Sequence, residues 1–315
     1  MAKAGSIDEH RVYLAGQGDG AAAVFYVAVR VPDLWAAAVA LGGTPRPAID
    51  SNRLYAANTH NVPVLWLFAQ AELEATAKTL KSAGYNLEWR RGSSANLSEI
   101  TGWLAAHRRE EFPVRADCET GSPAFSHCYW IHMTKFDPAQ RNDVLESTRV
   151  QPGSGAALAA GPFGFNPEAP GPGVTVASLP NGYKGPLQVN DRIVAIGGKA
   201  LSSPREFLDF MDHAVEEKSV VLMVERGSDR LRIETQIVLP KRTEVMTARV
   251  VGEYLPQVPE VRILSRAVTE MRVTIPPHWA PSTLTWNGSE LAKLEGGGCW
   301  LLSEKNQLLH AQKCQ

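Results

Sequence analysis

A glycine-rich turn near the start of the chain is the first place where the residue types permit chemistry. It reads Gly16-Gln17-Gly18-Asp19-Gly20-Ala21 and follows a short stretch rich in Val, Tyr and Leu. The spacing satisfies the G-x-G-x-x-A pattern of a dinucleotide-binding loop between a strand and a helix. However, the next expected strand ends at Leu41-Gly42-Gly43 without an acid to hold a ribose, and Asp19 would repel a pyrophosphate. We therefore expect no cofactor at this turn.

The cysteines and histidines show no metal-binding spacing. None of the cysteines forms a C-x-x-C pair; they are Cys118, Cys128, Cys299 and Cys314. The first two could bridge one loop, but we favour four free thiols. His127 and His132 lie five apart on an expected strand, 127–134, and should face opposite sides of it. The sequence thus predicts no metal site.

Length and charge limit the classes of partner. A chain of 315 residues is long enough for two or three domains. Its formal net charge is −1 and its basic residues are scattered, so we expect no nucleic-acid partner. No apolar run reaches the roughly 18 residues of a membrane span. The opening residues show no signal-peptide pattern, and the compartment stays open.

Strand-like and helix-like segments alternate four times before residue 115. The expected strands are 11–15, 35–41, 62–68 and 86–90, and the expected helices are 21–30, 51–57, 72–83 and 97–107. This alternation predicts a parallel sheet with helices on its faces.

This first region resembles the C-terminal half of the α/β-hydrolase fold, of the esterase and prolyl-oligopeptidase-like kind. The resemblance is carried by 7–16 (IDEHRVYLAG), Phe25-Tyr26, 31–39 (VPDLWAAAV) and 62–66 (VPVLW). The family exposes a nucleophilic serine in a G-x-S-x-G elbow on a sharp strand-to-helix turn. Gly18 occupies that position here, and glycine has no side chain to attack a carbonyl.

The other two triad positions differ as well. The resemblance places the acid at Glu72 and puts Ala95 where the family has its histidine. Without a nucleophile and a base, Glu72 has nothing to orient. We interpret His10, His60 and His107 as surface residues. The sequence therefore favours a hydrolase-like chain with no catalytic residue.

The elbow also comes early for this fold, which suggests an N-terminus that lacks an upstream half. The alternative function is therefore a serine esterase or peptidase, truncated or with its nucleophile elsewhere. A periplasmic or secreted location would remain compatible with such a truncation.

Residues 155–240 resemble a PDZ domain. The resemblance is carried by 174–179 (VTVASL), 185–199 (GPLQVNDRIVAIGGK) and 221–227 (VLMVERG). The second stretch follows the family's Gly-Leu-x-x-Gly-Asp-x-Ile-x-x-Ile-x-Gly run, with Asn190 where glycine is usual. PDZ domains bind a C-terminal or extended peptide by strand addition, and a loop of N–H groups holds the carboxylate.

The resemblance implies a peptide groove. Its carboxylate loop would be Pro162-Phe163-Gly164-Phe165, in which Pro162 has no N–H. Its other wall would be a helix at 204–215 that presents Phe207, Phe210 and Met211. Two alternatives stay open: these side chains only pack the core, or the domain is a rigid spacer.

The expected fold class is multidomain α/β plus β. Its parts are a partial α/β-hydrolase domain (1–115), a first β segment and linker (116–154), a PDZ domain (155–240) and a small β domain (241–315). We expect the last to be a sandwich whose first strand comes from 125–150, so that the PDZ domain is inserted into it. Trp279, Trp286 and Trp300 would pack its core rather than stack on a carbohydrate. The predicted function is non-catalytic binding of a peptide or protein.

Overall fold

The computed structural model describes residues 7–92, 96–137, 139, 144–150, 155–239 and 246–314. The chain forms two compact units. Unit 1 comprises Met1–Val150 and Val245–Gln315, and unit 2 comprises Gln151–Glu244. Unit 1 holds an α/β part and an all-β part, so the expected multidomain α/β plus β class holds at this coarse level.

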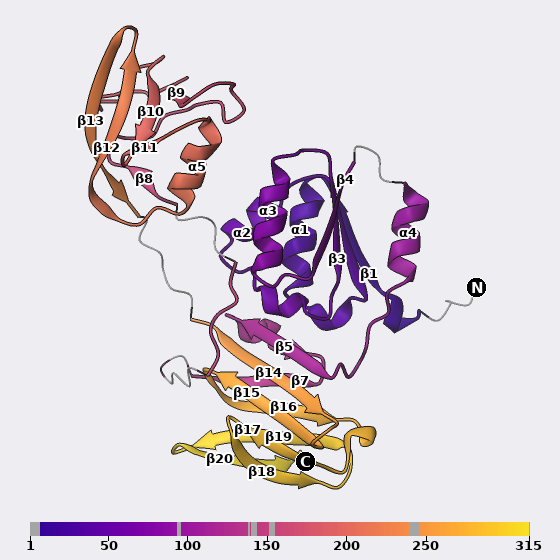
Figure 1. The fold of residues 1–315 in the computed structure, drawn as a ribbon. Coiled ribbons are helices and arrows are strands. Elements are labelled where there is room, and N and C mark those ends of the chain that lie inside the picture. The colour runs from indigo at the N-terminus through magenta and orange to yellow at the C-terminus, as the bar shows by residue number, and fades with distance from the viewer. Residues whose placement is uncertain are drawn as a thin grey trace. The chain divides into compact units, whose positions relative to one another are not determined.

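The α/β part of unit 1 is a four-stranded parallel sheet covered on both faces (Figure 1). The strand order is β1 (Tyr13–Gln17), β2 (Ala37–Leu41), β3 (Val64–Phe68) and β4 (Leu87–Arg91). The helices are α1 (Asp19–Ala28), α2 (Arg46–Asp50), α3 (Leu73–Ser82) and α4 (Leu97–Ala105). The parallel pairing predicted from the alternation is confirmed.

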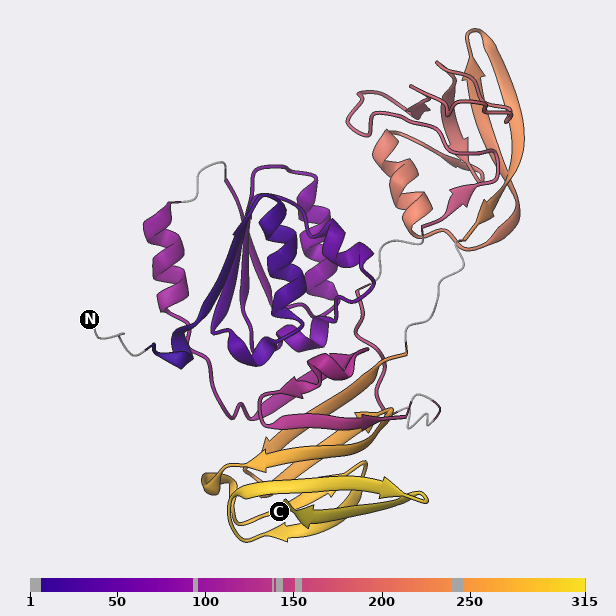
Figure 2. The same ribbon diagram turned by 180° about the vertical axis from the view of Figure 1, so that it is seen from behind.

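Successive residues of the central strands point to different cores, as the two-residue period of a strand requires. On one face, Val64 and Trp66 pack with α1, α2 and α3. On the other, Val39 and Leu65 pack against Ile100 of α4. Figure 2 shows α4 from behind, on the face opposite to α1 and α3.

One helix expected in this part is misplaced. Residues 51–57 do not form a helix; α2 ends at Asp50 and a short 3₁₀ turn, Ala56–Thr59, comes later. Pro47 lies in the first turn of α2, where proline is favoured. Asn52 then adopts a positive φ of 58°, which stops the helix.

The all-β part of unit 1 consists of two five-stranded sheets that enclose one apolar core. The first sheet has the order β18 (Ser289–Leu294), β17 (Ser282–Trp286), β15 (Glu260–Arg266), β14 (Ala248–Leu255) and β5 (Arg115–Thr120). The second has the order β20 (Leu308–Lys313), β19 (Gly298–Lys305), β16 (Val268–Ile275), β7 (Ile131–Phe136) and β6 (His127–Cys128). Trp279 and Trp286 are buried in the core, which rules out stacking of these two rings on a carbohydrate.

Strands that precede unit 2 in the sequence pair with strands that follow it. β5 pairs with β14, and β7 pairs with β16. The first strand of this part is β5, which begins at Arg115 and therefore earlier than the expected segment 125–150.

All four cysteines are paired, so the prediction of free thiols is wrong. Cys118 of β5 is bonded to Cys128 of β6, which links the two sheets. Cys299 of β19 is bonded to Cys314, just after β20. Both pairs depend on which strands stack or pair, and the spacing of cysteines along the sequence does not contain that information.

The buried residue Glu119 joins the α/β part to the all-β part. The main chain of Glu119 in β5 makes two hydrogen bonds with the Asn58 amide, of 2.7 and 2.8 Å. The Glu119 carboxylate accepts hydrogen bonds from the Ser147 and Thr247 hydroxyls and from the main-chain N–H and hydroxyl of Thr148. Because Glu119 is only 1% exposed, these four donors replace water as its partners.

Unit 2 is an antiparallel sheet packed against one helix, α5 (Pro204–Asp212). The strand order is β11 (Lys199–Ala200), β10 (Arg192–Ile196), β12 (Glu217–Arg226), β13 (Asp229–Val238) and β8 (Ala157–Leu158), and β9 (Val174–Thr175) also pairs with β10.

The turn before β10 in unit 2 contains a residue with a positive φ. Asn190 has a φ of 74°, a left-handed conformation that only glycine and a few polar residues adopt readily. The next residue, Asp191, makes a two-pronged ion pair with Arg226, with both distances 2.8 Å. The hydrogen bond from Arg226 lowers the pKa of Asp191.

Candidate functional site

The glycine-rich turn forms a strained backbone corner between β1 and α1. Gly18 has φ 59° and ψ −119°, a conformation that residues other than glycine rarely adopt. The neighbouring glycines are required by close approach, because a Cβ on Gly16 would lie 2.2 Å from the Gly20 oxygen and one on Gly43 would lie 2.1 Å from the Gly18 oxygen. The sharp strand-to-helix turn expected from the sequence is therefore present.

A cavity of about 510 Å³ opens at the carboxyl ends of these strands; we call it the elbow cleft. Its lining residues are Gln17, Gly18, Leu41, Gly42, Leu67, Phe68, Ala69, Gln70, Gly92, Leu97 and Ile100. Two glutamines are the polar side chains among these described residues, which therefore supply no nucleophile, general acid or general base.

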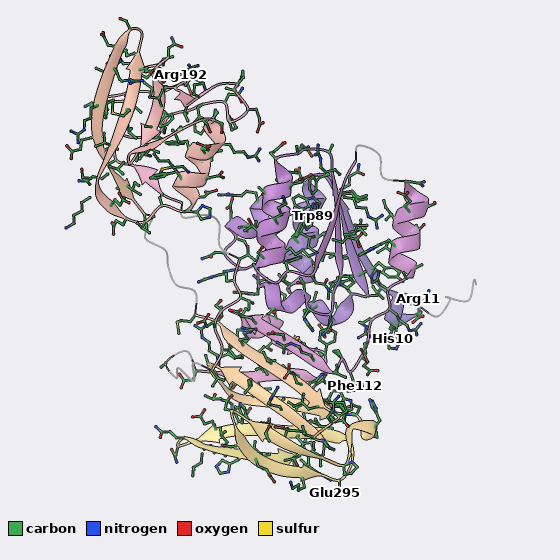
Figure 3. The ribbon with its side chains drawn as sticks, in the orientation of Figure 1. His10, Arg11, Trp89, Phe112, Arg192 and Glu295 are labelled. Atoms are coloured by element: carbon green, nitrogen blue, oxygen red, sulfur yellow. A yellow bond between two sulfur atoms is a disulfide. The ribbon has the colours of Figure 1, made fainter. Side chains whose placement is uncertain are left out.

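Of the two predicted triad positions among the described residues, the elbow cleft is lined by Gly18 but not by Glu72. Glu72 is the N-cap residue of α3 and is not part of the lining of the elbow cleft. Ala95 lies outside the described residues. His10 lies before β1, at the end of the sheet away from the carboxyl ends of the strands (Figure 3). In the described part of unit 1, Gly18 thus has no catalytic partner at the cleft.

A second hollow, in unit 2, contains most of the predicted peptide-binding residues; we call it the α5 groove. It has a volume of about 280 Å³. Its lining residues are Ala156, Ala157, Leu158, Gly161, Pro162, Phe163, Phe165, Phe207, Leu208, Met211 and Asp212. Phe207 belongs both to this lining and to the core, because only 5% of it is exposed.

Three aromatic rings hold the two walls of the α5 groove together. The ring of Phe207 lies 5.8 Å from that of Phe163 and 5.7 Å from that of Phe165. The Phe165 and Phe207 rings meet edge to face, an arrangement that stabilises aromatic pairs beyond their buried area. The loop and α5 are thereby held in a fixed spacing.

The loop wall of the α5 groove has an open main-chain edge. Gly164 pairs with the segment around Ser178: its N–H donates to the Ser178 oxygen at 2.9 Å, and its oxygen accepts from the Ala177 N–H at 2.8 Å. Main-chain groups of neighbouring residues in an extended segment point to alternate sides. Phe163 and Phe165 therefore direct theirs away from Ser178, and within the described chain these groups make no hydrogen bond.

Phe210 does not line the α5 groove, in contrast to its predicted place there. Its ring lies against Gly197, and it lines a different hollow together with Lys199, Asp209 and His213. Residues four apart on a helix are rotated by about 40°, whereas residues three apart are rotated by about 60° the other way. Met211 therefore shares the face of Phe207, and Phe210 falls beside it.

Two groove residues, Leu208 and Asp212, were missed by the sequence analysis. They lie one residue beyond Phe207 and Met211 in α5, and both are exposed. Their four-residue spacing was the available signal, because it extends the same helical face. Among the described residues of the lining, Asp212 is the one with a charged side chain.

A polar hollow of about 260 Å³ in unit 1 contains an unexpected aspartate–histidine pair. His127 Nδ1 lies 2.6 Å from Asp33 Oδ2, and this hydrogen bond raises the pKa of His127. His132 pairs with His127 across the β6–β7 hairpin, with ring centroids 5.7 Å apart. The prediction that the two histidines face opposite sides is wrong, because a turn at Tyr129, with φ 56°, separates them.

The described residues contain no group of three or more histidine, cysteine or acidic side chains placed to hold a metal ion. None of their helices is both long and apolar enough to cross a membrane. Comparison of the chain with models of protein families, with curated proteins and with solved structures gave no match.

Proposed function

We propose that the chain is a non-catalytic peptide-binding protein and that unit 2 is a PDZ domain whose α5 groove receives an extended peptide. The open main-chain edge at Phe163 and Phe165, facing α5 across an apolar hollow, is the observation that carries this proposal. A peptide adding to such an edge gains main-chain hydrogen bonds, and the hollow takes one of its side chains.

The turn before β10 supports the PDZ assignment. The left-handed conformation of Asn190 gives a physical reason for the glycine that the PDZ pattern has there. We further propose that the α/β part derives from an α/β-hydrolase and that the all-β part is an appended β-sandwich. The strained corner at Gly18 supports the first of these assignments, and the two sheets around one core support the second.

The alternative function, serine hydrolysis, is tested by labelling with a fluorophosphonate probe. The elbow cleft supplies no nucleophile from its described lining, so we expect no labelled serine. Labelling of Ser93 or Ser94, which lie outside the described residues, would contradict the non-catalytic proposal.

Peptide binding is tested with fluorescein-labelled peptides from a random library, titrated against the full chain and followed by polarization. We expect saturable binding that Leu208→Glu weakens about tenfold, because a carboxylate would replace apolar surface in the α5 groove. Val215→Glu is the matched control: Val215 is also an exposed aliphatic residue of unit 2, but it lies outside that groove. A folded chain that binds no peptide, or equal weakening by both variants, would contradict the proposal.

A further inference from the structure

We infer that the α5 groove selects an internal, extended segment with a basic side chain, rather than a free C-terminal carboxylate. This inference rests on the proposed peptide-binding function and concerns the chemistry of the ligand. It follows from the number of free N–H groups in the loop and from the charge of the lining.

The loop has too few free donors for a carboxylate. The N–H of Gly161 donates to the Leu158 oxygen at 2.9 Å, and that of Gly164 donates to the Ser178 oxygen at 2.9 Å. Pro162 has no N–H. Phe163 is therefore the one residue from 161 to 164 with an uncommitted N–H. A backbone anion site needs several successive N–H groups that converge on the ligand, and this loop does not provide them.

The charge of the groove also disfavours a carboxylate of the ligand. Asp212 lines the same hollow as the loop residues Gly161, Pro162 and Phe163, and none of the described residues that line it is basic. A ligand carboxylate there would lose its hydration without gaining partners, and it would be repelled by Asp212. A lysine or arginine side chain of the ligand would instead be attracted to Asp212.

The remaining wall favours a segment that continues past the groove. Phe163 and Phe165 offer two N–H and two C=O groups along an open edge, which suits a strand of the ligand. Phe207, Leu208 and Met211 form the apolar side opposite this edge. The ligand is therefore expected to place an apolar side chain against α5 and a basic one near Asp212.

The test compares two formats of one random heptapeptide library. In the first format the peptide is followed by a Gly-Ser extension, and in the second it ends in a free carboxylate. The best sequence is then made as a fluorescein-labelled peptide with an amidated end, with a free carboxylate, and with its basic residue changed to glutamine. We expect enrichment in the extended format and equal or tighter binding of the amidated peptide. Asp212→Asn should weaken the basic peptide several-fold but leave the glutamine peptide unchanged.

Asp209→Asn is the matched control, since Asp209 is an exposed acid on α5 outside the groove. Enrichment of free C-termini alone, with binding lost on amidation, would overturn the inference while the proposed function stands. A basic peptide that binds equally to wild type and Asp212→Asn would also overturn it. The absence of enrichment in both formats would overturn the proposed function itself.

Discussion

The carboxylate of Glu119 is predicted to hold unit 1 together, and its replacement should show this quantitatively. Four donors converge on its oxygens at 2.5 to 2.8 Å, from Ser147, Thr148 and Thr247. Hydrogen bonds to a charged group contribute about 1.5–3 kcal/mol each, and neutral ones about 0.5–1.5 kcal/mol. Glu119→Gln keeps the shape of the side chain but makes all four bonds neutral.

The expected loss can be worked out from the donors. The hydroxyls of Ser147 and Thr247 can rotate to accept from the new amide, whereas the main-chain N–H of Thr148 requires the carbonyl oxygen. Four bonds weakened by about 1 kcal/mol each, offset by the lower cost of burying a neutral group, give a net loss of about 2 kcal/mol. Glu119→Ala leaves the Thr148 N–H without an acceptor and should cost about 4 kcal/mol.

Tryptophan fluorescence during urea unfolding reports the unfolding of unit 1 selectively. All eight tryptophans belong to unit 1 and none to unit 2. Glu290→Gln is a suitable control, because Glu290 is an exposed acid in the same unit and its change should cost less than about 0.5 kcal/mol. If Glu119→Gln matched this control, or if Glu119→Ala were no worse than Glu119→Gln, the network would not carry the stability assigned to it.

Three further predictions concern other features of unit 1. Cys299→Ser with Cys314→Ser should lower its free energy of unfolding by about 3 kcal/mol, because the bond closes a 15-residue separation; an unchanged urea midpoint would contradict this. The pair between His127 and Asp33 raises the pKa of His127, so its contribution is full below the unfolded pKa and is lost as pH rises through the folded pKa. Asp33→Asn should therefore destabilise unit 1 more at about pH 5.5 than at about pH 8.5, as urea titrations at both pH values would show. Gly18→Ser should cost about 1–3 kcal/mol in the same assay and gain no fluorophosphonate labelling, since a Cβ fits there but the backbone is strained.

The sequence was most informative where local pattern determines structure. The buried strands 35–41 and 62–68 were predicted within a few residues, because runs of apolar residues between turns can hardly form anything else in an alternating chain. The strained corner at Gly18 followed from glycines that tolerate a positive φ.

Long-range pairing caused the main errors. Cys118 and Cys128 meet only because β5 and β6 belong to two sheets that pack against each other. The local sequence pattern does not predict which sheets pack together. His127 and His132 face each other because the chain turns at Tyr129, which has a positive φ. A tyrosine gives no reason to predict a positive φ from the sequence. In the α5 groove the error concerned the direction of a side chain around the helix axis. Three apolar residues were assigned to one helical face, although Phe210 lies outside it.

The hydrogen bonds of the Glu119 carboxylate also have a consequence for the insertion of unit 2 between the two segments of unit 1. Thr148, just before unit 2, and Thr247, just after it, bind the same carboxylate. At the other end of each connection, β8 pairs with β13 and joins the first and last strands of unit 2. Each unit therefore holds its own two attachment points close together, so the loop-closure entropy lost when one unit folds does not have to be lost again when the other folds. We therefore expect that another domain with neighbouring ends could replace unit 2 without disturbing the strand pairing of unit 1.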